Sequence, residues 1–190
     1  MRLQRILVMK LLKNEWVYVS TRRCGTNTLY ALLPGERSAQ YHIVPKERLA
    51  PLHWSVVRNP YDRAVSIWKH ALNSHQNTLR RICNNSQPSF ELFIEKALMS
   101  NNHDFWCQAR WLNTGIVDKT IHIENLAEGV LELTGLRINN NFRANKSDRN
   151  KWETYMNPTI ISLINDWADE DFKYGYTKLL PSETSDAQHD

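Results

Sequence analysis

The sequence contains little that would mark a disulfide-stabilised, zinc-binding or membrane-spanning protein. Its three cysteines, Cys24, Cys83 and Cys107, are spaced too widely for a disulfide framework or a zinc site. No apolar run is long enough to cross a bilayer, because the N-terminal stretch 6–12 is interrupted by Lys10 and reads better as a strand. No small-residue cleavage site follows it. We therefore expect a protein that is cytoplasmic or otherwise soluble, without a membrane partner.

The chain also lacks internal repeats and any linker that would divide it. We therefore expect a single domain over residues 1–180, followed by a frayed tail over residues 181–190. The formal net charge is +4, which suits an anionic ligand. Because lysine and arginine form no long run, nucleic acid is not an expected partner.

One segment has the features of an oxyanion-binding loop. Residues 16–20 are aromatic and β-branched, which predicts a buried strand, and an apolar helix pattern begins near Thr26. Gly25 between them allows close approach of the backbone to a ligand. A helix N-terminus, the hydroxyls of Thr26 and Thr28 and the cation of Arg23 would complete the site. The alternative is a polar turn with surface arginines.

A second anion site is predicted where another strand pattern ends. Residues 53–58 read as this strand, after which Asn59 suits a helix N-cap and Pro60 the first helical position. Arg58 would project from the strand end, and Ser66 lies nearly two turns into the helix. A guanidinium and a hydroxyl together suit a phosphate. The alternative is a surface arginine and a serine that only fills the helix.

Together these segments resemble the phosphate motifs of sulfotransferases that use 3′-phosphoadenosine 5′-phosphosulfate (PAPS). Residues 22–29 are similar to the family's 5′-phosphosulfate loop, Pro-Lys-x-Gly-(Thr/Ser)-x-(Ser/Thr)-Leu. Residues 58–66 are similar to its 3′-phosphate motif, Arg-(Asp/Asn)-Pro-x-x-Arg-x-x-Ser. Segments 103–112, 121–126 and 145–147 resemble later parts of the carbohydrate-type members.

The resemblance covers residues 16–176 approximately and implies a fold, an activity and a set of ligand contacts. The fold is α/β, a central parallel sheet flanked by helices, as in the P-loop-like sulfotransferases. The activity is transfer of a sulfuryl group from PAPS to an acceptor hydroxyl on a carbohydrate, with 3′-phosphoadenosine 5′-phosphate (PAP) as product and no metal. The residues that it assigns to the nucleotide are Arg22, Arg23, Cys24, Gly25, Thr26, Asn27, Thr28, Arg58, Ser66, Asn145, Lys146 and Ser147.

The chain departs from the family at the Pro-Lys pair, which is Arg22-Arg23 here. Arg23 falls on the lysine position and is assigned to the leaving phosphate. A planar guanidinium keeps the charge but changes the geometry around the leaving oxygen. The acceptor must also lose a proton. We assign that step to His42, on a short strand pattern between the two motifs. The alternatives are Glu47, His53 and His103.

Helix patterns continue along the rest of the chain. They are predicted over residues 90–99, 105–112 and 126–133, and a last helix has Asn157 as N-cap. Arg63 is expected to brace the site through an ion pair. Trp106 and Trp111 are expected to pack in the core or, alternatively, to line an acceptor cleft.

Two other functions stay open. One is a nucleotide kinase or NTPase with a degenerate phosphate loop. It is disfavoured because the chain has no Gly-x(4)-Gly-Lys-(Ser/Thr) motif and no apolar strand ending in an aspartate for Mg²⁺. The other is a non-catalytic module that binds anions such as glycans, which would need no general base.

Overall fold

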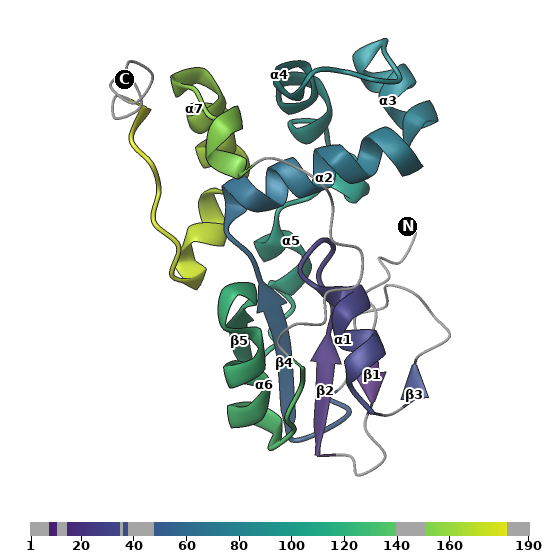
Figure 1. Cartoon of the computed structure of the whole chain (residues 1–190), viewed down its shortest axis with the longest axis vertical. Helices are drawn as coiled ribbons and strands as arrows, with labels where there is room; N and C mark the ends of the chain where they lie inside the picture. Colours follow the sequence, from purple (N-terminus) through teal and green to yellow (C-terminus); the bar gives the residue numbers. More distant parts are fainter. Residues whose placement is uncertain (1–7, 11–14, 35, 38–47, 140–150, 182–190) are drawn as a thin grey trace. The chain divides into compact units, whose positions relative to one another are not determined.

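The computed structural model describes residues 8–10, 15–34, 36–37, 48–139 and 151–181 (Figure 1). The chain divides into two compact units. The first comprises residues 1–58 and 110–146, and the second comprises residues 59–109 and 147–190. The predicted short strand that carries His42 and most of the predicted tail lie outside the described residues.

The first unit is built on a five-stranded sheet of order β3-β1-β2-β4-β5. Its strands are β1 (Val8–Lys10), β2 (Trp16–Val19), β3 (Glu36–Arg37), β4 (Leu52–Val57) and β5 (Lys119–His122). β2, β4 and β5 are parallel, whereas β1 is antiparallel to both β2 and β3.

The fold class is therefore α/β as predicted, and the three neighbouring strands β2, β4 and β5 are parallel, whereas β1 pairs antiparallel with β2. Only five residues separate Lys10 from Trp16. A parallel connection needs a crossover of a dozen residues or more, while an antiparallel pair needs only a short turn. The short spacing therefore makes β1 and β2 an antiparallel pair, and the parallel part of the sheet is confined to β2, β4 and β5.

Two helices of the first unit, α1 (Thr26–Leu32) and α6 (Leu126–Thr134), pack on the same sheet face. That face presents alternate residues of the strands, as the period-two geometry of a strand requires. The buried cluster that they form contains Trp16, Tyr18, Trp54, Val56 and Ile121 from the strands, with Leu29 and Val130 from the helices. Figure 1 shows both helices running alongside these strands.

Gly129 within α6 explains its close packing on the sheet, and Gly135 just after it explains where the helix ends. A Cβ at Gly129 would lie 2.4 Å from Cγ2 of Ile121 on β5, so only glycine lets the helix approach the strand this closely. Gly135 follows the last helical residue with φ +70°, a left-handed conformation that glycine adopts without strain. The helix thus ends one residue beyond the predicted range of 126–133.

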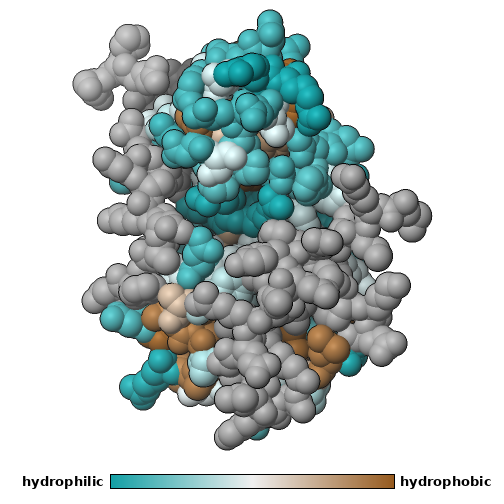
Figure 2. Space-filling view, turned by 90° about the vertical axis from the view of Figure 1, so that its right-hand side faces the viewer, coloured by the Kyte–Doolittle hydropathy of each residue, from teal (hydrophilic) through white to brown (hydrophobic). Residues whose placement is uncertain are grey.

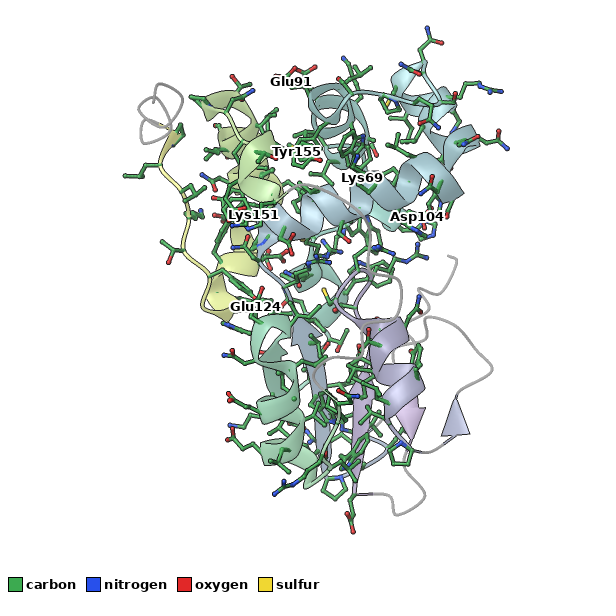
Figure 3. All side chains as sticks on the ribbon, viewed as in Figure 1. Lys69, Glu91, Asp104, Glu124, Lys151 and Tyr155 are labelled. Carbon is green, nitrogen blue, oxygen red and sulfur yellow. The ribbon has the colours of Figure 1, made fainter. Side chains whose placement is uncertain are left out.

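The second unit is mostly helical. It contains α2 (Pro60–Ser74), α3 (Gln76–Cys83), α4 (Phe90–Leu92) continued by a π-helical turn η1 (Phe93–Leu98), the 3₁₀ turns η2 (His103–Phe105), η4 (Trp152–Tyr155) and η5 (Asp169–Tyr174), and α7 (Pro158–Trp167). Its core is a single cluster in which the aromatic rings of Trp68, Phe90 and Tyr155 contact one another. Tyr155 and Glu91 are labelled in Figure 3.

The predicted helix caps are confirmed. The side chain of Asn59 accepts a hydrogen bond of 2.9 Å from the backbone N–H of Tyr61, and Pro60 is the first residue of α2. Asn157 likewise accepts a hydrogen bond of 2.9 Å from the N–H of Ile160 at the start of α7. Each cap satisfies a backbone donor that the helix itself leaves unpaired.

The helix predicted over residues 105–112 begins later than expected. α5 spans only Gln108–Leu112, and Trp106 before it is extended, with φ −60° and ψ 149°. The carboxylate of Asp171 accepts hydrogen bonds from the backbone N–H groups of Gln108 and Ala109, so a residue far along the chain caps this helix. In the part of the chain that the structure describes, no helix has the length and apolar character needed to cross a bilayer.

Candidate anion-binding site

The loop between β2 and α1 is held by side chains of its own and of β4. Gly25 has φ +78°, a conformation that the turn into α1 requires and that glycine adopts freely. The hydroxyl of Thr26 donates to the carbonyl of Thr21 at 2.9 Å, and the hydroxyl of Thr21 donates to the carbonyl of Val56 on β4 at 2.7 Å. These two bonds close the loop and tie it to the neighbouring strand.

Arg58, the first residue of the second motif, contacts the loop within this unit. Nη1 of Arg58, which follows β4, donates a hydrogen bond of 3.1 Å to the carbonyl of Arg23 in the loop. Since β2 and β4 are parallel neighbours, their carboxyl ends lie at the same edge of the sheet. Arg23 itself has φ +65°, which is uncommon for a residue with a side chain. The hydrogen bond brings these two residues together, while their roles in binding an anion stay predictions.

Arg22 is positioned by an aromatic ring. Its guanidinium carbon lies 5.6 Å from the ring centroid of Trp111, within the range of a cation–π contact. Trp111 is buried, so the expectation that it packs in the core holds, and in addition it supports a cation of the loop. Because the two residues are 89 positions apart in the sequence, no local pattern indicated this contact.

The other loop residues differ in what they present. The side chains of Cys24 and Thr28 are buried, so a ligand would meet their backbone groups. Cys24 places its sulfur 3.5 Å from the carbonyl of Arg22, which suits a small packing residue. Asn27 is exposed. Since α1 has only seven residues, its dipole adds little, and the arginines supply most of the positive charge.

Ser66 and Arg63 lie in the second unit. Ser66 is buried on α2. Arg63 is completely buried, with Nη2 donating to the carbonyl of Trp106 at 2.8 Å and its guanidinium 5.4 Å from the ring of Trp167. Arg63 therefore contacts a carbonyl and an aromatic ring of its own unit, and the predicted ion pair that braces the site stays a prediction. Trp106 is buried, as expected for a core residue.

The remaining assigned residues lie outside the described part of the chain. These are His42, Glu47, Asn145, Lys146 and Ser147. Their predicted roles as general base, alternative base and nucleotide-covering loop stay predictions.

His53, an alternative base, is structural in this fold. It is completely buried near the start of β4, whereas Arg58 follows the end of that strand. Its Nε2 accepts from the N–H of Leu49 at 3.2 Å, and its own N–H donates to Asp118 at 2.8 Å. Burial and the nearby guanidinium of Arg48 lower the pKa of His53, although the carboxylate of Asp118 acts in the opposite direction. The ring is thus buried at the opposite end of β4 from Arg58.

Asp118 also receives Nη2 of Arg48 at 2.6 Å. Burial alone would raise the pKa of Asp118, but hydrogen bonds from Arg48 and from the backbone of His53 lower it overall.

His103, the other alternative base, has a side chain that is 60% exposed and lies 3.3 Å from Asp104 in the second unit. An exposed imidazole beside a carboxylate can accept a proton, so His103 stays a candidate.

No group of three or more histidine, cysteine, aspartate or glutamate side chains within the described ranges is arranged to hold a metal ion. A scan against models of known protein families, a search of curated proteins and a search of solved structures each found no match to this chain.

Proposed function

We propose that the chain is a sulfotransferase that moves a sulfuryl group from PAPS to a hydroxyl group of an acceptor, with carbohydrate as the expected acceptor class. The observation that supports it is the hydrogen bond from Arg58 to the carbonyl of Arg23. It joins two sequence motifs that resemble the two phosphate-binding motifs of that family. Two linked phosphate sites at one sheet edge suit a nucleotide with phosphate groups on both its 5′ and 3′ oxygens.

Each residue then has a role that fits its place. The 5′-phosphosulfate binds to the loop over residues 21–28, where Arg22 and Arg23 offset the charge that grows on the leaving phosphate. Arg58 carries five N–H donors, so one guanidinium is able to hold both the loop and the 3′-phosphate. Ser66 is assigned to the same phosphate by the motif alone.

The reaction is an in-line displacement at sulfur. A bond forms between the acceptor oxygen and sulfur, and the bond between sulfur and the 5′-phosphate oxygen breaks, releasing PAP. The acceptor proton passes to His42, which we assign as general base. Asn145, Lys146 and Ser147 are assigned to cover the nucleotide. No step in this scheme requires a metal ion.

A thermal-shift comparison separates this function from that of a nucleotide kinase or NTPase. PAP should stabilise the protein in the presence of a metal chelator, by roughly 2.7 kcal/mol at about 100 times its dissociation constant. ATP with Mg²⁺ should give a much smaller shift. A clear shift with ATP and Mg²⁺ alongside none with saturating PAP would overturn the proposal in favour of an NTPase.

A further inference from the structure

Trp111 on α5 lies against the side chain of Arg22, in the loop between β2 and α1. The guanidinium carbon of Arg22 lies over the indole ring, 5.6 Å from its centroid, and both residues belong to the first unit. Trp111 is only 3% exposed, so its surroundings hold the ring in place. Arg22 is half-buried, and its Nε is buried. The contact therefore joins a fixed aromatic ring to a cation of the candidate anion site.

The backbone on both sides of Arg22 is held as well. The hydroxyl of Thr21, which precedes it, donates to the carbonyl of Val56 at 2.7 Å. The carbonyl of Arg23, which follows it, accepts from Nη1 of Arg58 at 3.1 Å. Arg22 is thus fixed at its backbone by its neighbours and at its guanidinium by the ring. An arginine held in this way loses less conformational freedom on binding a ligand than a fully exposed one.

Contact with a ring face leaves a guanidinium able to bind an oxyanion. The positive charge is attracted to the π-electrons of the ring. The N–H groups of a guanidinium lie in its own plane, where two of them match two oxygens of a phosphate. Partial burial strengthens the attraction between the cation and such an anion. The motif that this loop resembles has a proline at the position of Arg22, so the arginine adds a charge to the loop.

We propose that Trp111 is a positioning residue, which holds the guanidinium of Arg22 in the orientation that binds the 5′-phosphate group of the nucleotide. This role rests on the proposed function, because it assigns the loop to that phosphate. Trp111 acts through Arg22 and does not itself contact the nucleotide. A tryptophan that only filled the core would instead affect binding in the same way whether or not Arg22 is present.

A double-mutant cycle, with PAP affinity measured by calorimetry on the full chain, separates these two roles. Trp111→Leu keeps an apolar side chain but removes the π face, and it should weaken PAP by about five- to tenfold. Trp111→Phe keeps a smaller π face and should weaken PAP by only about twofold. In an Arg22→Ala background, neither Trp111 variant should weaken PAP further. In an Arg23→Ala background, both should keep their full effect.

Trp16 gives a matched control for the loss of a buried indole. It is also 3% exposed and lies in the same unit, but it packs against Trp54 at the start of β2, whereas the loop follows the end of that strand. Trp16→Leu should lower the melting temperature and yet change PAP affinity by less than about twofold. A loss of affinity equal to that of Trp111→Leu would overturn the proposal.

A second control addresses anions that are attracted elsewhere on the protein. Figure 2 shows a mostly hydrophilic surface on the second unit, and α3 of that unit carries the exposed Arg80 and Arg81. Arg80→Ala should change PAP affinity by less than about twofold. Adenosine 5′-phosphosulfate, which has no 3′-phosphate, should be weakened by Trp111→Leu by the same factor as PAP, because both ligands place a phosphate in the loop.

The same cycle with inorganic pyrophosphate tests the loop without a nucleotide. Coupling between Trp111 and Arg22 for pyrophosphate, without any PAP stabilisation, defeats only the proposed sulfotransferase function. PAP binding that falls additively in the Trp111 and Arg22 variants defeats only the positioning role. If neither pyrophosphate nor PAP binds at millimolar concentration, both proposals are overturned.

Discussion

The carboxylate of Asp171 accepts hydrogen bonds from both the backbone N–H and the side-chain amide of Gln108, at 2.9 and 3.2 Å, although 63 residues separate the two. The same carboxylate accepts from the N–H of Ala109 at 2.6 Å. Asp171 is completely buried. It also contributes, after burial itself, to raising the pKa of Tyr174 to about 12, together with Cys107 and Glu170. One buried side chain thus determines where α5 begins.

Asp171→Ala should therefore destabilise the protein strongly. The substitution leaves buried N–H donors without an acceptor, and each such donor costs about 1–3 kcal/mol. We therefore expect the free energy of unfolding to fall by about 3 kcal/mol. Asp169→Ala is the control, because Asp169 is largely exposed and pairs with Lys178 at the surface. Its loss should stay below about 1 kcal/mol. Urea denaturation measures both, and equal losses would show that Asp171 has no special role.

The same contact shows why the sequence predicts some elements better than others. The strand over residues 16–20 and the caps Asn59 and Asn157 depend on neighbours within a few residues, so local patterns identified them. The start of α5 depends on Asp171, and the support of Arg22 depends on Trp111. Such partners lie far away in the sequence, and no local sequence pattern indicates that they pair.

The sheet illustrates the same limit in another form. The periodicity of residues 16–20 and 53–58 predicts strands, but periodicity does not specify direction. The antiparallel pairing of β1 with β2 follows from the short connection between them. For the candidate site, the resemblance assigns Arg23 and Arg58 to one nucleotide, which stays a prediction; the structure shows the hydrogen bond that joins the two residues. The hydrogen bonds of Thr21 and Thr26 that close the loop and join it to Val56 are not indicated by any local pattern in the sequence.

Arg58→Ala should separate the roles of the two phosphate sites. We expect it to weaken PAP by about 10- to 150-fold, the equivalent of the 1.5–3 kcal/mol of a charge-assisted hydrogen bond. Adenosine 5′-phosphosulfate lacks the 3′-phosphate and should be weakened much less. Arg48→Ala, which removes a cation bound to Asp118 in the same unit, should leave both affinities nearly unchanged. Calorimetric titrations measure the affinity for both nucleotides. Equal losses of affinity for the two would show that Arg58 holds the loop and does not bind the 3′-phosphate.

Gly129→Ala should destabilise the first unit despite the higher helix propensity of alanine. The new Cβ would lie 2.4 Å from Cγ2 and 3.0 Å from Cγ1 of Ile121, so α6 or β5 must shift. Overpacking of this kind costs about 1–3 kcal/mol, against a propensity gain of about 1 kcal/mol.

A double variant that combines Gly129→Ala with Ile121→Ala tests whether the steric clash causes this loss of stability. Ile121→Ala alone leaves a cavity and should cost about 2–5 kcal/mol. If the clash is the reason, adding Gly129→Ala to that background should cost nothing further or recover stability, a coupling that a double-mutant cycle measures. Strictly additive losses would contradict the steric explanation.

Stability should fall in acid through His53. Its folded-state pKa lies below the unfolded value, so the unfolded chain binds the proton more readily. The stability that this pKa difference contributes is fully present above about pH 6.5, and it is lost as the pH falls towards the folded-state pKa. Asp118 adds a second loss below about pH 3.8, because its folded pKa is also lowered. His53→Gln should flatten the first decline in a series of urea titrations, while an unchanged slope would assign that decline to other histidines.

The last prediction concerns His42 as the general base, which rests on its place in the sequence between the two phosphate motifs. Since a base contacts the acceptor and not the nucleotide, His42→Ala should leave the PAP-induced thermal shift nearly intact. Turnover should fall by about 10²- to 10⁴-fold, the usual contribution of a positioned base. The rate of the wild type should rise with pH as an imidazole loses its proton, and that rise should vanish in the variant.

His103→Ala and Glu47→Gln are the comparisons that make this result specific. If His42 is the base, Glu47→Gln should keep most of the rate at saturating acceptor. His103→Ala should likewise keep most of the rate if His42 is the base. A His42 variant that keeps most of its rate would show that the base lies elsewhere. Loss of the pH-dependent rise in the His103 variant would then identify His103, whose imidazole lies beside Asp104, as the base.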